Sequence, residues 1–355
     1  MTVDLPKTMK AVVLEAPYKV AVKEVPTPEI KEDNDVIVKT KLAGLCAEQA
    51  CWNREASPPS PPPPPSAPAP ASLTAGSDLH IYRGHQPGCD GITIGHEILG
   101  TVVQVGKGVK SFKPGAEYVR IPEGEASLYH APPEVPEKLM LLMADIIPTG
   151  YYVAYQARHG MDDGQIPSQS LDGTVVQPEG KKGVCVVVGC GPVGLCAITC
   201  AKTMFETVFA TDLAPHRLEA ARKHGAIALP PSELKEAVLK ATEGRGADAA
   251  CEVVGHQSAL DTAIDAVRPY GTVASCGLHT HDVTVPGLTL YGKNLKLIFG
   301  RCAVRTYTPA AMQVLKDNVD LFESFVEHEV SVDKAPEYYE MFEKNKIAKT
   351  AFVFE

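Results

Sequence analysis

Apolar and polar residues follow two different patterns along this chain of 355 residues. Residues 8–45 contain short apolar runs separated by turn residues, and the stretch from Gly95 to Gly115 continues that pattern. Short runs of this kind predict a mainly β region. Residues 137–157 form one long apolar stretch, and its length indicates a helix.

The second pattern begins at Gly183, after a polar segment rich in glycine and proline that predicts a loop. Strand-like and helix-like segments alternate from there: GVCVVVG, GPVGLCAITCAKT, TVFATD, PHRLEAARKHGA, ADAACEVVG, ALDTAIDAV, GTVASCG and LKLIFG. Alternation of this kind predicts a parallel sheet covered by helices.

A glycine-rich turn follows the first of these strands. Gly189, Gly191 and Gly194 have the spacing G-x-G-x-x-G, and Pro192 and Val193 open the following helix. The first glycine permits a tight turn, the second lets the backbone approach a pyrophosphate, and the third permits close packing of helix and strand. The N–H groups at the helix start attract the pyrophosphate. The pattern predicts a dinucleotide site, although an ordinary strand-to-helix turn can contain the same glycines.

The next strand ends in TVFATD, which places Asp212 18 residues after Gly194. A carboxylate at this position accepts hydrogen bonds from a ribose 2′-hydroxyl and repels a 2′-phosphate. The alternative is a solvated aspartate that follows a strand. The spacing therefore favours NAD over NADP.

Composition and charge exclude several classes of protein. The chain is 45% hydrophobic and 22% charged, as globular proteins are. Its formal net charge of −9 provides no basic surface for nucleic acid or anionic lipid. No secretory signal and no membrane-spanning apolar run is found, and the ten scattered cysteines are typical of reduced thiols. We expect a cytoplasmic protein with a small-molecule substrate.

Several residues upstream of the dinucleotide turn can hold a metal ion or move a proton. Cys46, the segment GSDLH at 76–80, His96 and Glu97 of GHE, and Asp145 form this set. Alone, His96 fits a structural role and Cys46 fits a small buried side chain. Asp145 is the only charged residue in LMLLMADIIPTGYYVAY, and a buried carboxylate is costly unless it is paired or bound to metal. Its alternative role is a helix cap or a turn residue.

The segments GHEILGTVVQVG, AEYVRIP, MADIIPTGYYVA, VVVGCGPVGLCAI and IFGRCAVR together resemble the zinc-dependent medium-chain alcohol dehydrogenases. The resemblance covers the chain except 47–75 and roughly 158–180. It implies an α/β fold, with a doubly wound parallel Rossmann sheet and a mainly β GroES-like barrel domain. Within the family the chain is similar to the formaldehyde-dehydrogenase-like branch, which has an aspartate in place of the usual third cysteine ligand. The resemblance also implies a homodimer or homotetramer.

The resemblance implies one catalytic zinc ion, which would act as a Lewis acid on an alcohol. Its ligands would be Cys46, His96 and Asp145, and a fourth position would stay open for substrate or water. Glu97 would lie behind the metal. Asp78 would orient His96.

The resemblance also implies a proton path and further cofactor contacts. Hydride would move between the carbinol carbon and nicotinamide, and the hydroxyl proton would leave through Ser77, the cofactor ribose and His80. Arg217 resembles the family's contact to the adenosine side of the cofactor, and Lys349 resembles its late contact to the phosphate. Both also fit as surface cations.

The chain departs from the family pattern directly after Cys46, where residues 47–75 are inserted. Nine of the 13 residues from Pro58 to Pro70 are proline, a composition that favours polyproline II and forms no core. The insert is either a tether for SH3-like or WW-like partners or a non-native segment, such as an intron translated in frame. Because closing a longer loop costs little extra, the zinc site can assemble if the insert loops out.

The second departure is a loss, since the chain runs from FKPG directly into AEYVRIP. The family has a barrel strand and a cysteine-rich lobe here, so we expect no structural zinc, a damaged edge of the β domain and a more open active-site mouth. The expected domains are a GroES-like catalytic domain at 1–153 that contains the insert, a Rossmann NAD-binding domain at 154–300, and a C-terminal segment at 301–355 that returns to the catalytic domain.

The leading hypothesis is a zinc- and NAD-dependent oxidoreductase. It would transfer hydride between a primary or secondary alcohol, or an aldehyde hydrate, and nicotinamide. The rival hypothesis is a catalytically impaired, dinucleotide-binding family member whose zinc site is disrupted by the insert. A third hypothesis is a zinc-free enzyme that uses NADPH, as in quinone-reductase-like relatives. Asp212 and the GHE motif argue against it.

Overall fold

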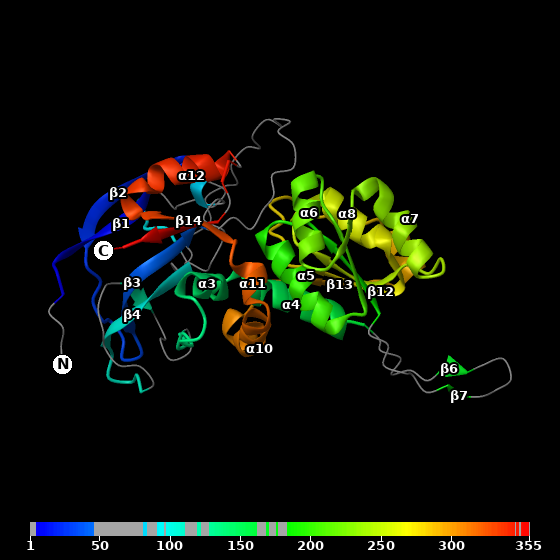
Figure 1. The fold of residues 1–355 in the computed structure, drawn as a ribbon, viewed down its shortest axis with the longest axis horizontal. Coiled ribbons are helices and arrows are strands. Elements are labelled where there is room, and N and C mark those ends of the chain that lie inside the picture. Colours follow the sequence, from blue (N-terminus) through cyan, green and yellow to red (C-terminus); the bar gives the residue numbers. More distant parts are fainter. Residues whose placement is uncertain are drawn as a thin grey trace.

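The protein is described by a computed structural model with two sheet-containing parts side by side (Figure 1). The structure describes residues 5–45, 81–83, 91–95, 97–110, 119–121, 128–161, 168–169, 175–176, 183–344, 346–347 and 349–354. Among these residues, no helix has both the length and the apolar composition needed to cross a bilayer.

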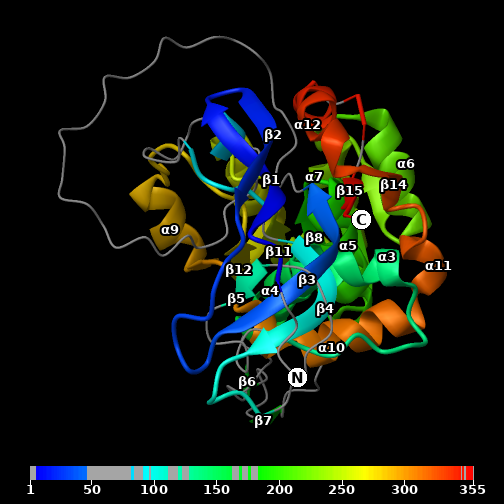
Figure 2. The same cartoon turned by 90° about the vertical axis from the view of Figure 1, so that its left-hand side faces the viewer.

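The first part is mainly β, as the short apolar runs predict. Its main sheet has the strand order β14-β15-β3-β4, and β5 pairs with the other end of β3. The hairpin β1–β2 lies beside it (Figure 2), and α12 packs against β2. The elements are β1 (Thr8–Ala16), β2 (Lys19–Pro26), β3 (Val36–Leu45), β4 (Glu97–Val105), β5 (Val119–Ile121), β14 (Val326–Ser331), η2 (Val332–Lys334), α12 (Ala335–Glu343) and β15 (Lys349–Val353).

The second part is a six-stranded parallel sheet with the order β10-β9-β8-β11-β12-β13. Its central strands are almost continuously apolar because helices cover both faces. The predicted fold class is confirmed. The elements are β8 (Val184–Val188), α5 (Pro192–Met204), β9 (Thr207–Thr211), α6 (Pro215–Lys223), β10 (Ile227–Leu229), α7 (Pro231–Ala241), β11 (Ala247–Glu252), α8 (Gln257–Ala266), β12 (Val267–Ser275), α9 (Gly287–Lys293) and β13 (Lys296–Phe299).

The long apolar stretch at 137–157 does not form one helix. It divides into α3 (Glu137–Met140), the 3₁₀ helix η1 (Leu141–Ala144) and α4 (Ile146–His159). The break is at Asp145, whose φ of −151° and ψ of −67° are not helical. The backbone therefore changes direction at Asp145, the only charged residue between 139 and 155.

Helix α4 joins the two parts of the molecule. It packs against α5 and against strands β11 and β12 of the parallel sheet, while η1 packs against β4 of the first sheet. One buried apolar cluster continues from Leu42 of β3 through α4 to Val187 of β8 and Ala351 of β15. The two sheets therefore share a core.

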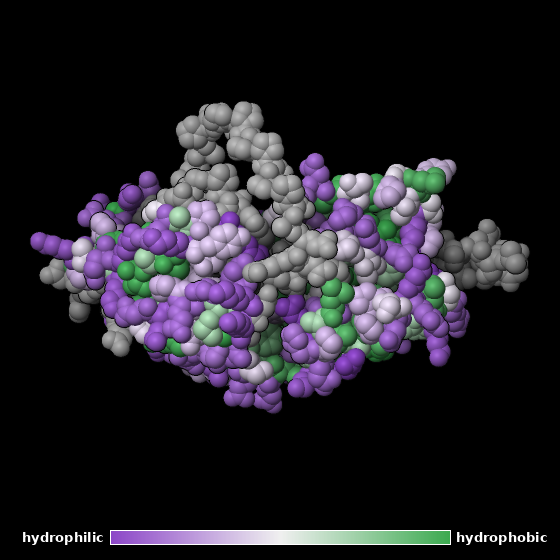
Figure 3. Space-filling model, turned by 90° about the horizontal axis from the view of Figure 1, so that it is seen from above, coloured by the Kyte–Doolittle hydropathy of each residue, from purple (hydrophilic) through white to green (hydrophobic). Residues whose placement is uncertain are grey.

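The remaining described elements are short or peripheral. Helix α10 packs against α4, and α11 follows it. Two strands of two residues pair with each other in the segment that was predicted as a loop. These elements are β6 (Ser168–Gln169), β7 (Val175–Val176), α10 (Val304–Asp317) and α11 (Val319–Phe322). On the side shown in Figure 3, the described surface is mostly polar, with apolar residues in small separate patches.

Candidate active site

The turn between β8 and α5 has the geometry that each of its glycines was predicted to provide. Gly189 has a φ of +100°, and a Cβ there would lie 2.5 Å from Val254 Cγ2. A Cβ on Gly194 would lie 2.0 Å from the carbonyl oxygen of Gly189. Among the described residues, no protein atom lies within 4 Å of a Cβ on Gly191. The fold therefore requires glycine at 189 and 194, while Gly191 borders open space.

That open space lies at the start of α5. Gly191 is the N-cap residue, and Pro192 occupies the first turn, where its missing N–H costs no hydrogen bond. Val193 is buried and anchors the helix start in the core. The free N–H groups and the positive end of the helix dipole face outward here. These residues fit the pyrophosphate of a dinucleotide.

Asp212 lies beside this turn, directly after β9, and is 4% exposed. The Cys190 N–H donates a hydrogen bond to its Oδ2 at 2.8 Å, and the Ala214 N–H donates to its Oδ1 at 2.9 Å. The Arg217 guanidinium lies 3.8 Å from Oδ2. Each carboxylate oxygen can accept more than one hydrogen bond, so Asp212 keeps acceptor capacity for a ribose hydroxyl. The structure brings the predicted adenosine-side residues together.

Glu97 is fully buried at the start of β4. It pairs in register with Gly44 of β3, and a Cβ on Gly44 would lie only 2.1 Å from Glu97 Oε2. Glycine at this position therefore makes room for the carboxylate. The Lys349 ammonium, 3% exposed, lies 2.5 Å from the same oxygen. The structure places Lys349 beside Glu97, and its predicted contact with a cofactor phosphate stays a prediction.

Asp145 lies at the other side of this buried region, as the N-cap residue of α4. The Thr149 hydroxyl donates a hydrogen bond of 2.7 Å to Asp145 Oδ1, which fixes the carboxylate against the first turn of the helix. Asp145 thus has the helix-terminal position that was weighed as an alternative. That position does not prevent it from binding a metal ion, because a carboxylate has further lone pairs.

The fully buried Cys196 on α5 shows that these charges share one region. Burial raises the pKa of its thiol well above the usual range, Lys349 lowers it, and Glu97 and Asp145 raise it further. Lys349 and both carboxylates therefore lie within electrostatic reach of one buried thiol. Carboxylate oxygens are zinc ligands, so the described part of the predicted metal site has donor atoms that suit a divalent metal ion.

Five predicted residues lie outside the part of the chain that the structure describes. They are Cys46, Ser77, Asp78, His80 and His96. Among the residues that it does describe, no group of three metal-binding side chains occurs. Leu45, which precedes Cys46 in the chain, and Glu97, which follows His96, are on paired strands of one sheet.

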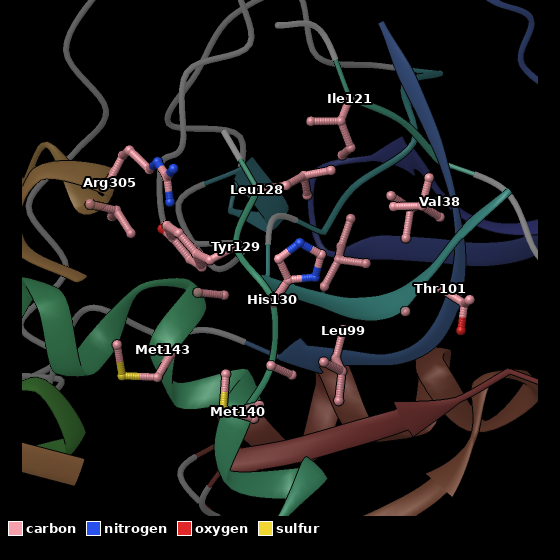
Figure 4. A pocket seen from close by; sticks show the side chains of 16 residues that line it. Val38, Leu99, Thr101, Ile121, Leu128, Tyr129, His130, Met140, Met143 and Arg305 are labelled. Atoms are coloured by element: carbon pink, nitrogen blue, oxygen red, sulfur yellow. The ribbon is translucent and has the colours of Figure 1, made fainter. Parts of the chain in front are cut away.

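A pocket of about 640 Å³ lies along strand β4 (Figure 4). Its wall includes Ile98 and Ala144, the chain neighbours of Glu97 and Asp145. Most of the other lining side chains are apolar, and Tyr129, His130 and Arg305 add polar groups. In the described residues the pocket follows β4, the last strand of its sheet. Residues 111–118, at the expected missing lobe, are not described, so the damaged barrel edge stays a prediction.

Sequence reasoning missed two features of this site. The pairing of Glu97 with Lys349 depends on the register of β15, β3 and β4, which no local pattern reveals. A second buried carboxylate, Glu252, ends β11 at the same edge of the parallel sheet as Asp212. The sequence pattern that could have revealed Glu252 is an acidic residue at the end of an apolar segment, as Asp212 is in TVFATD.

Known proteins share both halves of this architecture. The model of the alcohol dehydrogenase GroES-like domain matches residues 70–131, and that of the zinc-binding dehydrogenases matches residues 192–317. The chain is 35% identical to zinc-type alcohol dehydrogenase B of Aspergillus flavus over 97% of this chain and 81% of that protein. It is 34% identical to a medium chain reductase/dehydrogenase of an Acremonium species over 77% of this chain and 95% of that protein.

A solved structure supports the same assignment. The alcohol dehydrogenase of a Thermus species has a TM-score of 0.78 and 26% sequence identity, with 98% of this chain and 100% of that chain covered. The dinucleotide turn, the buried carboxylates and these similarities have one explanation: the chain belongs to the zinc-containing medium-chain alcohol dehydrogenase family, and it is a zinc-type alcohol dehydrogenase-like oxidoreductase.

Proposed function

We propose that the protein oxidises a primary or secondary alcohol, or an aldehyde hydrate, with NAD as hydride acceptor and one catalytic zinc ion. The observation that carries the proposal is the geometry of the dinucleotide turn. Gly191 borders open space at the start of α5 while Gly189 and Gly194 are fixed by the fold. An ordinary strand-to-helix turn has no need for a glycine that faces empty space.

In this proposal the chain's residues select NAD through charge. Asp212 accepts hydrogen bonds from the hydroxyls of the adenosine ribose and repels the 2′-phosphate of NADP. Arg217, whose guanidinium lies 3.8 Å from that carboxylate, contacts the adenosine in this proposal. The turn from Gly189 to Gly194 holds the pyrophosphate through backbone N–H groups.

The metal site of the proposal contains Cys46, His96 and Asp145, with Glu97 behind the metal. An aspartate in the third ligand position would place the chain in the formaldehyde-dehydrogenase-like branch. When bound there, a zinc ion supplies Lewis-acid chemistry that makes an alcohol hydroxyl easier to deprotonate. The Thr149 hydroxyl keeps the Asp145 carboxylate in place.

Ser77 and His80 would pass on the proton of the substrate hydroxyl, and Asp78 would orient His96. The largely apolar pocket along β4 suits the carbon chain of the substrate, because burying apolar atoms there removes them from water. No cysteine-rich run is present in the sequence, so we expect no structural zinc.

The test is to measure bound zinc per chain and to titrate the same preparation with NAD, followed by turnover of a series of small alcohols. We expect about one zinc per chain, as three-ligand catalytic sites bind, together with NAD binding and turnover. D145N should lose zinc and turnover while NAD binding stays. D282N, in an exposed loop, should change none of these.

The rival function has a different outcome. NAD binding without zinc and without turnover would show a dinucleotide-binding protein whose metal site is interrupted by the insert at 47–75. Loss of both NAD binding and zinc in the wild-type protein would contradict both proposals.

A further inference from the structure

A buried polar cluster at the carboxyl ends of β11 and β12 has no role in the function proposed above. Glu252 ends β11, Ser275 ends β12, and His279 lies four residues after Ser275 in the following loop. Glu252 and Ser275 are almost completely buried, and the side chain of His279 is 10% exposed. A charged group in such a place requires partners.

Glu252 has a complete set of partners. The N–H groups of Val254 and Gly255 donate to Oε1 at 2.8 and 2.7 Å. The Ser275 hydroxyl donates to Oε2 at 2.6 Å, and His279 Nε2 lies 3.2 Å from the same oxygen. Hydrogen bonds to the Glu252 carboxylate therefore connect the loops that follow two neighbouring strands.

The backbones of these two loops also touch each other. A Cβ on Gly277 would lie 2.1 Å from the backbone nitrogen of Gly255, and a Cβ on Gly255 would lie 2.6 Å from the backbone of Leu278. Both glycines permit an approach that any side chain would prevent. The loop that contains His279 is thus held rigidly against the end of β11.

The contact with Glu252 also determines the tautomer of His279. An ionised carboxylate only accepts hydrogen bonds, so in the tautomer that satisfies this contact Nε2 of His279 carries the proton and donates a hydrogen bond to Glu252. Nδ1 is then a hydrogen-bond acceptor, and it makes no hydrogen bond within the described residues. The ring also packs against Phe299, with centroids 5.6 Å apart. The cluster therefore presents one acceptor in a fixed orientation.

The strand order places this acceptor relative to the cofactor. Ligands of such sheets bind outside the carboxyl ends of the strands, where the strand order reverses, which here is between β8 and β11. Asp212 lies on the β9 side of that point, where the adenosine half binds in our proposal. The nicotinamide half must then cross to the ends of β11 and β12, where His279 lies.

We propose that His279 binds the nicotinamide riboside half of NAD, and that Glu252 and Ser275 are positioning residues which hold its ring. Nδ1 accepts a hydrogen bond from a donor on that half, either the carboxamide N–H or a ribose hydroxyl. This inference rests on the proposed use of NAD. It adds a contact on the side of the cofactor where the sequence offered no candidate residue.

Two substitutions of His279 separate binding from structure. In H279Q the amide can occupy the place of Nε2 and keep the contact with Glu252, but it offers no acceptor at Nδ1. In H279N the amide lies near Nδ1 and loses the contact with Glu252. We expect H279Q to weaken NAD affinity by about tenfold, as for one lost hydrogen bond, and H279N to weaken it less. H281Q, in the exposed part of the same loop, is the matched control.

The affinities of NAD, ADP-ribose and AMP are measured by calorimetry for the wild type and each variant. If H279Q weakens NAD alone, the donor is the carboxamide; if it weakens NAD and ADP-ribose equally, the donor is the ribose. AMP affinity should not change in either case. Equal NAD affinity in H279Q and wild type, or an equal loss for AMP, overturns the inference and leaves the proposed function intact. Failure of the wild type to bind NAD would overturn both.

Discussion

In the dinucleotide turn, Gly194 is needed for folding and Gly191 for cofactor binding. Gly194 packs against the carbonyl oxygen of Gly189, so a methyl group at 194 collides with backbone that has nowhere to move. Gly191 has an ordinary φ of −71°, and its missing Cβ has no neighbouring atom in the part of the chain that the structure describes. The same chemical change, glycine to alanine, should therefore have different effects three positions apart.

We predict that G191A folds like the wild type, with a change in the free energy of unfolding within about 0.5 kcal/mol, while its NAD affinity falls at least about tenfold because the methyl group occupies the pyrophosphate's place. G194A should lose NAD affinity too, and in addition about 3 kcal/mol of stability. Urea unfolding without ligand and calorimetric titration with NAD measure the two effects. Unchanged NAD affinity in G191A would mean that this turn does not hold the cofactor.

His224 provides a pH dependence that belongs to the fold and not to the active site. Its ring packs against Phe322 and Phe325, and its Nδ1 lies 2.7 Å from the Thr199 hydroxyl. Burial lowers its pKa from 6.5 to about 4. Between these pH values the unfolded chain binds a proton that the folded protein does not, so stability rises with pH.

We predict that protonation of His224 in the unfolded chain lowers the free energy of unfolding by about 3 kcal/mol as pH falls from 6.5 to 4. The measurement is the slope of unfolding free energy against pH. H224F should have a smaller slope in this window, because any constant loss from the substitution cancels in a slope. H216N, at an exposed position, should keep the wild-type slope. A wild-type slope in H224F would contradict the prediction.

The residue scale also shows what the sequence could predict of the site. The dinucleotide glycines and Asp212 were predictable because one strand, one turn and one helix contain or adjoin them all. The contact between Glu97 and Lys349 was not, because it depends on a strand pairing between residues at opposite ends of the chain. Glu252 and His279 have no family-like spacing that would reveal their contact.

At the scale of elements, helices α4 and α5 approach each other closely at Gly150. A Cβ on Gly150 of α4 would lie 2.6 Å from the backbone nitrogen of Ala197 and 2.7 Å from the carbonyl carbon of Cys196. Asp145 begins α4, and the dinucleotide turn begins α5. A change in this contact would therefore affect both the metal ligand and the cofactor turn.

We predict that G150A destabilises the protein by about 1–3 kcal/mol, because the added methyl group forces the two helices apart. It should also lower the amount of bound zinc, since Asp145 moves with the helix. G287A, in the first turn of α9 with no described neighbour near its Cβ, is the matched control and should leave bound zinc unchanged and lose no stability, because alanine is the better helix former. Equal stability of G150A and G287A would show that the helices adapt.

Element prediction succeeded where the pattern was local. The segments that predicted strands and helices after Gly183 coincide largely with β8, α5, β9, α6, β11, α8, β12 and β13, but none of them covers α7 or α9. The short edge strand Ile227–Leu229 was missed because three residues carry too little periodicity. The break at Asp145 was foreseen only as the alternative role of that residue, because the apolar run around it shows no boundary.

At the scale of the whole molecule, the parallel sheet ends in an exposed strand. Within the described residues no strand pairs with the outer edge of β13. Beside it, Leu288 and Tyr291 of α9 are 82% and 83% exposed, and Phe299 of β13 is 44% exposed. Exposed apolar side chains next to an unpaired strand edge are typical of an interface. We propose that two copies of the chain pair through this edge.

We predict that the wild-type protein has at least twice the mass of one chain in light scattering. Y291E should shift it toward the monomer, because a charge would be buried in the interface. I227E, at the opposite edge of the same sheet, is the matched control and should keep the wild-type mass. A monomeric wild type, or dissociation by I227E alone, would contradict the proposal.

The shared core has a consequence for building chimaeras with relatives. Exchanging the cofactor-binding part alone would cut the apolar cluster that runs from Leu42 through α4 into the parallel sheet. A crossover between 159 and 192 would place α4 of one parent against α5 of the other, where Gly150 leaves no tolerance. Productive crossovers should retain α3, η1, α4 and α5 from one parent. The unit to exchange intact is therefore this group of helices and not either domain.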